Sequence, residues 1–142
     1  MYIKEFVFTY RIAKLGLRKS NRNNIIMSVT TIYHNPRCSK SRAALELLTE
    51  KDIDAKVVKY LDTPPTRTEI EKILELLKME PRELMRKSEQ EYSENNLDDP
   101  SLSRDELIDA IIKFPRLIER PIVVKDGKAA IGRPIQNIID IL

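Results

Sequence analysis

The order in which strand and helix patterns follow one another limits the possible folds of this chain more than any other feature. Residues 29–33 form a short β-rich run, and a turn signal at 34–36 ends it. The apolar spacing then predicts a helix over about 38–51 and a second strand over 55–61. We therefore expect the domain to begin with a β-α-β unit.

The middle of the chain has a helical pattern. Two Ser/Thr-x-x-Glu capping boxes, at 66–69 and 103–106, mark the first turns of two helices. A short helical stretch is expected after Pro81, and Phe114-Pro115 should end the later helix, because a residue before proline is kept out of the α region. Residues 88–100 are polar and are predicted to form a loop.

The last part of the chain predicts a hairpin and a closing helix. Asp126-Gly127 lies between the apolar runs 121–124 and 128–131 and is a strong hairpin signal. Pro134 is expected at the first helical position of the closing helix. Strands and helices in this mixed order predict an α/β domain with helices packed on a small sheet.

The net charge of +3 is unevenly distributed over the 142 residues. Residues 1–26 contain six basic side chains and one acidic one, which leaves a net charge of −2 for residues 27–142. We interpret 1–26 as a basic N-terminal extension, upstream of a true start at Met27 or weakly ordered, and 27–142 as the domain. Since the basic character lies outside the domain, no nucleic-acid partner is expected.

The alternative interpretation of residues 1–26 is that they form a targeting segment. Charged residues interrupt its apolar ones and no small-residue cleavage site follows, so it differs from a secretory signal. Ile3, Phe6, Val7 and Tyr10 share one helical face, which leaves a transit peptide or a basic membrane-surface helix open. The apolar runs of the chain are too short for a transmembrane helix, and no membrane partner is expected.

Cys38 is the only cysteine and His34 the only histidine of the chain. These counts exclude an intramolecular disulfide, a thiolate-rich metal site and a histidine metal cluster. We expect no metal and no organic cofactor. If Cys38 is oxidised during a reaction, the electrons must come from an external thiol.

The position of Cys38, between a strand-turn and the start of a helix, favours a reactive thiolate. The unpaired N–H groups and the partial positive charge of a helix N-terminus stabilise an anion. Arg37, Lys40 and Arg42 add positive charge, and such surroundings lower the pKa of a thiol. The same groups would hold an oxyanion beside the sulfur. The alternative is that a lone cysteine is a small buried core residue.

Residues 32–42, Ile-Tyr-His-Asn-Pro-Arg-Cys-Ser-Lys-Ser-Arg, resemble the active-site segment of the glutaredoxin-coupled arsenate reductase family. Matching motifs follow in order at Tyr60-Leu61, 64–67, Leu84-Met85-Arg86-Lys87, 119–124 and Gly132-Arg133-Pro134. The resemblance covers essentially residues 29–142. It implies a thioredoxin/glutaredoxin-like mixed sheet with a helical insertion between the second and third strands.

The resemblance also assigns roles to residues around the cysteine. These are the attacking Cys38, the thiolate-stabilising His34 and Ser41, the oxyanion-binding Arg86, Arg120 and Arg133, and the cis-proline Pro121. Arginine suits an oxyanion because its planar fork donates two hydrogen bonds and stays charged. Arsenate, glutathione as co-substrate, glutaredoxin as partner and a cytoplasmic location are implied in the same way.

The expected function is therefore that of an oxidoreductase, an arsenate reductase that depends on glutathione and glutaredoxin and forms a Cys38 adduct. One alternative is a related glutathione-dependent thiol oxidoreductase with little arsenate activity. Another is a non-enzymatic redox-stress regulator, but such regulators use a C-x-x-C switch, and Ser41 stands at its second cysteine position. A cysteine phosphatase loop would need an arginine where Ala44 stands.

Overall fold

The computed structural model describes residues 17–19, 25–27 and 29–142. Leu17–Lys19 (β1) pairs antiparallel with Ile25–Met27 (β2) in a two-stranded sheet of its own. Residues 3–10, for which an amphipathic helix was one interpretation, lie outside the described residues, and the domain start at Met27 stays a prediction. In the described ranges no helix is both long and apolar enough to cross a membrane.

Four further strands form a mixed sheet in the order β4-β3-β5-β6. Thr30–His34 (β3) runs parallel to Ala55–Lys59 (β4) and antiparallel to Ile122–Lys125 (β5), which pairs with Lys128–Ile131 (β6). The turn at 126–127 joins β5 to β6, and its two residues have φ of 50° and 74°. The left-handed conformation that Asp-Gly tolerates thus makes the predicted hairpin, which is confirmed.

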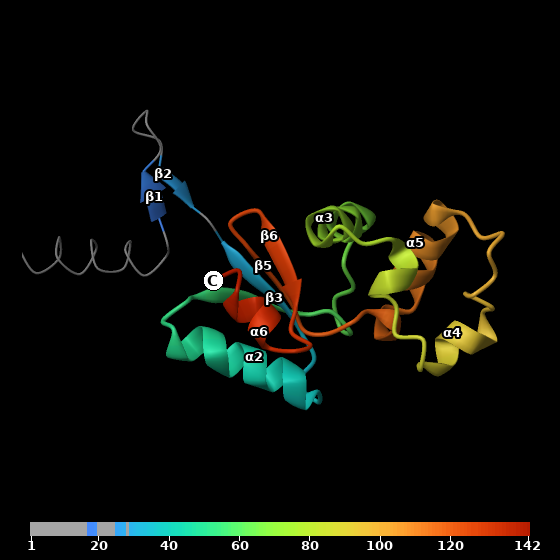
Figure 1. Cartoon of the computed structure of the whole chain (residues 1–142), viewed down its shortest axis with the longest axis horizontal. Helices are drawn as coiled ribbons and strands as arrows, with labels where there is room; N and C mark the ends of the chain where they lie inside the picture. The colour runs from blue at the N-terminus through green and yellow to red at the C-terminus, as the bar shows by residue number, and fades with distance from the viewer. Residues whose placement is uncertain (1–16, 20–24, 28) are drawn as a thin grey trace, which may run out of the picture.

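Helices cover both faces of this sheet. Successive residues of a strand point to opposite faces, so each strand contributes side chains to two separate cores. Ile32 pairs with Val123, and both belong to a core formed with Ser39–Glu50 (α2) and Gln136–Ile139 (α6). Tyr33, the next residue of β3, belongs to the core on the other face. Figure 1 shows α2 and α6 together on one side of the sheet.

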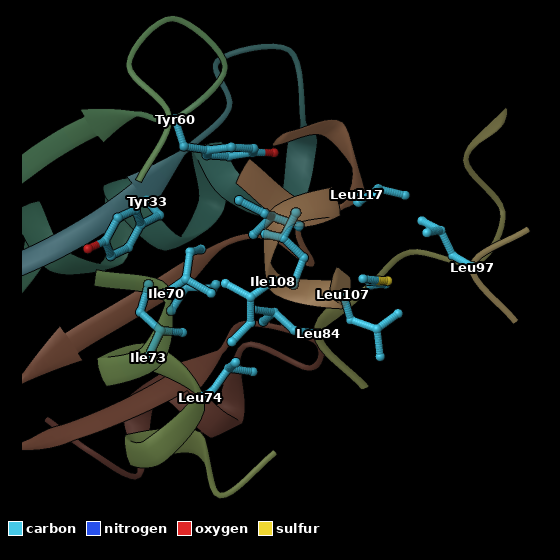
Figure 2. Packing of buried hydrophobic residues seen from close by; sticks show 14 of the residues in the cluster. Tyr33, Tyr60, Ile70, Ile73, Leu74, Leu84, Leu97, Leu107, Ile108 and Leu117 are labelled. Atoms are coloured by element: carbon cyan, nitrogen blue, oxygen red, sulfur yellow. The ribbon is translucent and has the colours of Figure 1, made fainter. Parts of the chain in front are cut away.

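A helical segment is inserted between β4 and β5 and covers the second face. Its elements are Arg67–Leu77 (α3), Pro81–Leu84 (η1), Gln90–Glu94 (α4), Arg104–Lys113 (α5) and Pro115–Leu117 (η2). Their apolar side chains share one core with two tyrosines of the sheet region, Tyr33 and Tyr60 (Figure 2). The predicted α/β class and the insertion between the second and third strands of the mixed sheet are confirmed.

The ends of the inserted helices follow from local sequence. Thr66 and Glu69 bond reciprocally, with the Thr66 N–H donating to Glu69 Oε2 at 2.8 Å and the Glu69 N–H to Thr66 Oγ1 at 3.2 Å. The same box forms at Ser103 and Glu106. Helix α5 ends at Lys113, directly before Phe114-Pro115, as predicted.

Two local predictions were wrong. The predicted loop 88–100 contains α4, because Tyr92 and Leu97 are buried in the core and Arg82 Nε donates to the Leu97 carbonyl oxygen at 2.9 Å. The closing helix begins at Gln136, and Pro134 belongs to a turn before it. That turn is tighter than an α-helix, since the Asn137 N–H donates to the Pro134 carbonyl oxygen three residues back.

Candidate functional site

The topology of the sheet brings three chain segments to one edge. Because β5 runs antiparallel to both β3 and β6, the end of β3, the start of β5 and the end of β6 lie together. His34 ends β3, Pro121 precedes β5, and Arg133 follows β6 by two residues. Helix α2 starts at the same edge, directly after Cys38.

Cys38 is the N-cap residue of α2 and is half-buried. This position places the sulfur next to the first N–H groups of α2, which have no partner within the helix. Burial by itself raises the pKa of the Cys38 thiol, but the backbone N–H groups of Ser41 and Lys40 and the guanidinium of Arg120 lower it, and the net shift is downward. This environment favours the thiolate, which is the nucleophilic form of cysteine.

His34 and Ser41 lie on either side of the turn at residues 35–38, and their side chains meet. His34 Nδ1 is 2.7 Å from Ser41 Oγ, and the Asn35 N–H donates to the same oxygen at 2.9 Å. Both side chains are buried, with 5% of His34 and none of Ser41 exposed. Burial lowers the pKa of His34, and the positive charges of Lys59 and Arg42 act in the same direction. The hydrogen bond with Ser41 opposes this shift but does not reverse it. The His34 ring and the Asn35 N–H thus fix the Ser41 hydroxyl, while the sulfur is stabilised by the Ser41 backbone N–H.

Arg133 and Arg120 lie beside the sulfur, and the Arg133 side chain bonds the backbone of Arg120. Arg133 Nη2 is 3.5 Å from Cys38 Sγ, and Arg133 Nε donates to the Arg120 carbonyl oxygen at 2.7 Å. The pKa of Arg120 is raised although burial opposes this, because Tyr60 and the Cys38 sulfur favour its charged form. Two of the three predicted arginines thus meet at the cysteine.

Both arginine–proline bonds at this edge are cis. Arg120–Pro121 is the bond for which the resemblance implied this, and Arg133–Pro134 was not anticipated from the sequence. Gly132 is packed tightly here, since a Cβ on it would lie 2.8 Å from Pro121 Cγ and 2.6 Å from Ile138 Cδ1.

Arg86 lies in the inserted helical segment, directly after Met85, next to the segment that leads into Arg120. Its backbone N–H donates to the Leu117 carbonyl oxygen at 2.6 Å, and the Glu119 N–H donates to the Leu84 carbonyl oxygen at 2.8 Å. These bonds hold Arg86 alongside the segment that leads into Arg120. The predicted third arginine is therefore close to the second, although their link runs through a carboxylate.

That carboxylate belongs to Glu89, a residue that the sequence analysis did not single out. Glu89 Oε1 lies 3.6 Å from Arg86 Nε and 3.8 Å from Arg120 Nη1. No local motif could have identified its contact with Arg120, which lies 31 positions further along the chain.

A pocket of about 320 Å³ adjoins residues 34–37, which lead into Cys38. Its lining residues are His34, Asn35, Pro36, Arg37, Lys59, Leu61 and Asp62. Arg37 and Lys59 give this pocket two cationic side chains next to the segment that carries Cys38. Among the described residues, no three His, Cys, Asp or Glu side chains are grouped so that they could hold a metal ion.

Comparisons with known proteins agree on one family. Residues 33–141 match the model of the ArsC family. The chain is 54% identical over 112 residues to an arsenate reductase of Neisseria meningitidis, covering 78% of this chain and 96% of that protein. It is 40% identical over 116 residues to an arsenate reductase of Escherichia coli, covering 82% of each. The solved structure of an arsenate reductase from Vibrio cholerae superposes with a TM-score of 0.78 at 46% identity, covering 81% of this chain and 98% of that one.

Proposed function

The chain belongs to the ArsC family, and we propose that it is an arsenate reductase whose nucleophile is the Cys38 thiolate. The observation that carries this proposal is the placement of Cys38 at the start of α2, with Arg133 Nη2 3.5 Å from the sulfur and the thiol pKa lowered. A thiolate beside an arginine fork is suited to attack an anion that the arginine holds.

In the first step, the Cys38 sulfur attacks the arsenic atom of arsenate. An S–As bond forms and one As–O bond breaks, and the oxygen leaves as water after taking up protons. Arg133 and Arg120 neutralise the charge of the incoming anion, which the thiolate alone would repel. Arg86 would bind the same oxyanion from the side of the inserted segment.

The second step needs an external thiol, because Cys38 is the only cysteine of the chain. We assign this role to glutathione, whose thiolate attacks the Cys38 sulfur. The electron pair of the S–As bond stays on arsenic, which leaves as arsenite, and a mixed disulfide between Cys38 and glutathione remains. Glutaredoxin then reduces the disulfide and restores the thiol.

The pocket beside residues 34–37, which has two basic side chains and one acidic one, Asp62, supports a small anionic thiol as co-substrate. Glutathione carries two carboxylates, and Arg37 and Lys59 line a pocket that adjoins the active-site turn. We therefore propose this pocket as the glutathione site, and the cytoplasm, where thiols are kept reduced, as the location of the reaction.

The test is arsenite production from arsenate with reduced glutathione and glutaredoxin, with the residue 27–142 chain and the full chain compared. Wild-type protein should form arsenite, and Cys38→Ser should remain at background. Retained activity in Cys38→Ser would refute the assignment.

A related glutathione-dependent thiol oxidoreductase is the second candidate, and the same pocket favours it. Such an enzyme would reduce a glutathionylated model thiol efficiently and arsenate poorly. We expect turnover on arsenate to exceed turnover on the model thiol, and the reverse ranking would favour the second candidate.

A further inference from the structure

Glu89 lies among three arginines. Its Oε1 atom faces Arg86 Nε at 3.6 Å and Arg120 Nη1 at 3.8 Å, and its Oε2 atom faces Arg116 Nη2 at 3.4 Å. Only 13% of the Glu89 side chain is exposed, and the exposed fractions of Arg86 and Arg120 are 19% and 17%. The Glu89 carboxylate is therefore largely shielded from solvent by the arginines, and its ion pairs are screened less than those of an exposed surface pair.

Glu89 does not use up the donors of these arginines. Arg86 Nη1 is buried and has no hydrogen-bond partner within the described part of the chain, whereas the Arg120 guanidinium also faces Tyr60 and the Cys38 sulfur. A buried donor without an acceptor is costly, so the cluster has capacity for one more acceptor group. An oxyanion that binds Arg86 and Arg120 would supply it, and it would then lie next to the Glu89 carboxylate.

A carboxylate next to a bound oxyanion favours anions that carry a proton over anions that are fully ionised. An ionised carboxylate can only accept a hydrogen bond. An oxyanion that still carries a proton can donate a hydrogen bond from its O–H group to the Glu89 carboxylate. A fully ionised oxyanion has no such donor, so the Glu89 carboxylate only repels it. Near neutral pH, arsenate and phosphate carry at least one proton, and sulfate carries none.

We propose that Glu89 makes this site selective for tetrahedral oxyanions that carry a proton, and that it rejects fully ionised ones such as sulfate. This inference rests on the proposed function of the cysteine and its arginines as an oxyanion site. A site that binds a hydroxyl group rejects an analogue without that hydroxyl, because the buried polar group of the site then has no hydrogen-bond partner. We expect a preference of at least about tenfold for phosphate over sulfate.

The experiment measures how well arsenate, phosphate and sulfate each protect Cys38 from alkylation by iodoacetamide near neutral pH. Cys38 is the only cysteine, so the signal reports this site alone. The proteins compared are wild type, Glu89→Gln and Glu91→Gln. Glu91 is a matched control, because its carboxylate is 20% exposed and lies 3.6 Å from Arg116 Nη1.

Wild type and Glu91→Gln should prefer phosphate and arsenate to sulfate, and Glu89→Gln should bind sulfate more tightly and bring the ratio close to one. A ratio is used because any general gain in positive charge strengthens the binding of all three anions. An unchanged ratio in Glu89→Gln, or a wild type that binds sulfate and phosphate equally, would overturn the inference while leaving the oxyanion site intact. The wild-type comparison decides the matter even if the variant does not fold. If none of the three anions protects wild-type Cys38, the proposed function fails as well.

Discussion

Arg120 is the residue whose replacement should reveal most about the site, because it serves several partners at once. Its guanidinium stabilises the Cys38 sulfur, its Nη1 atom faces Glu89 at 3.8 Å, and its carbonyl oxygen holds Arg133. Arg120→Lys keeps the positive charge and the backbone carbonyl but replaces the planar fork by a single ammonium group. A lysine can face the sulfur or the carboxylate, and it cannot bond both as the fork does.

The size of the effect follows from the lost hydrogen bond to a charged group, which contributes about 1.5–3 kcal/mol. Since every 1.4 kcal/mol is tenfold, kcat/KM for arsenate should fall about 10- to 100-fold. The pKa of Cys38 should move upward, because Arg120 is one of the groups that lower it.

Two assays check this prediction, arsenate-dependent consumption of glutathione and the pH profile of Cys38 alkylation. Arg104→Lys is the matched control, since this arginine is 48% exposed and lies 3.9 Å from Glu80. The control should stay within about twofold of wild type, as surface changes usually do. If Arg120→Lys also stays within twofold and alkylates with the wild-type pH profile, Arg120 does not stabilise the thiolate, and the description of the site is wrong.

Three further predictions concern stability. Because the pKa of buried His34 is lowered from 6.5, the unfolded state binds a proton more readily, so the free energy of unfolding should fall as pH drops through about 6.5. Urea denaturation of His34→Gln should show a weaker fall over that range; identical slopes would contradict the assigned burial. Ile108→Ala, at a fully buried position at the centre of Figure 2, should lower the free energy of unfolding by about 2–5 kcal/mol, and a loss below about 1 kcal/mol would refute its core role. Gly132→Ala places a methyl group 2.6 Å from Ile138 Cδ1 and should cost about 1–3 kcal/mol in thermal unfolding, whereas an unchanged Tm would show that the neighbouring side chains yield.

The fold was largely predictable because its signals are local. The capping box at Thr66 and the hairpin turn at 126–127 each depend on residues within four positions, and both form as expected. The helix at 90–94 was missed because five residues are too few to show a helical period. Tyr92 and Leu97 stabilise it through tertiary packing, and neither could be recognised as buried from a polar stretch of sequence.

The site was predictable only as far as a motif or a resemblance extended. The placement of Cys38 at a helix start could be read from a strand-turn-helix pattern. The resemblance assigned Arg133 to oxyanion binding, and the structure places its Nη2 atom 3.5 Å from the sulfur. The resemblance assigned Ser41 to stabilising the thiolate, and in the structure its hydroxyl bonds His34 while its backbone N–H lies at the sulfur. Glu89 escaped notice because its partners converge through the pairing of two distant segments.

The most direct test of the central claim, that Cys38 is an activated thiolate at an oxyanion site, is the rate of its alkylation as a function of pH with and without arsenate. Since the thiolate is the reactive form and its pKa is lowered, the rate should reach half of its maximum below the pH expected for an ordinary thiol. Arsenate should slow the reaction at every pH. A half-maximum at or above the ordinary value, with a rate that arsenate does not change, would contradict the account.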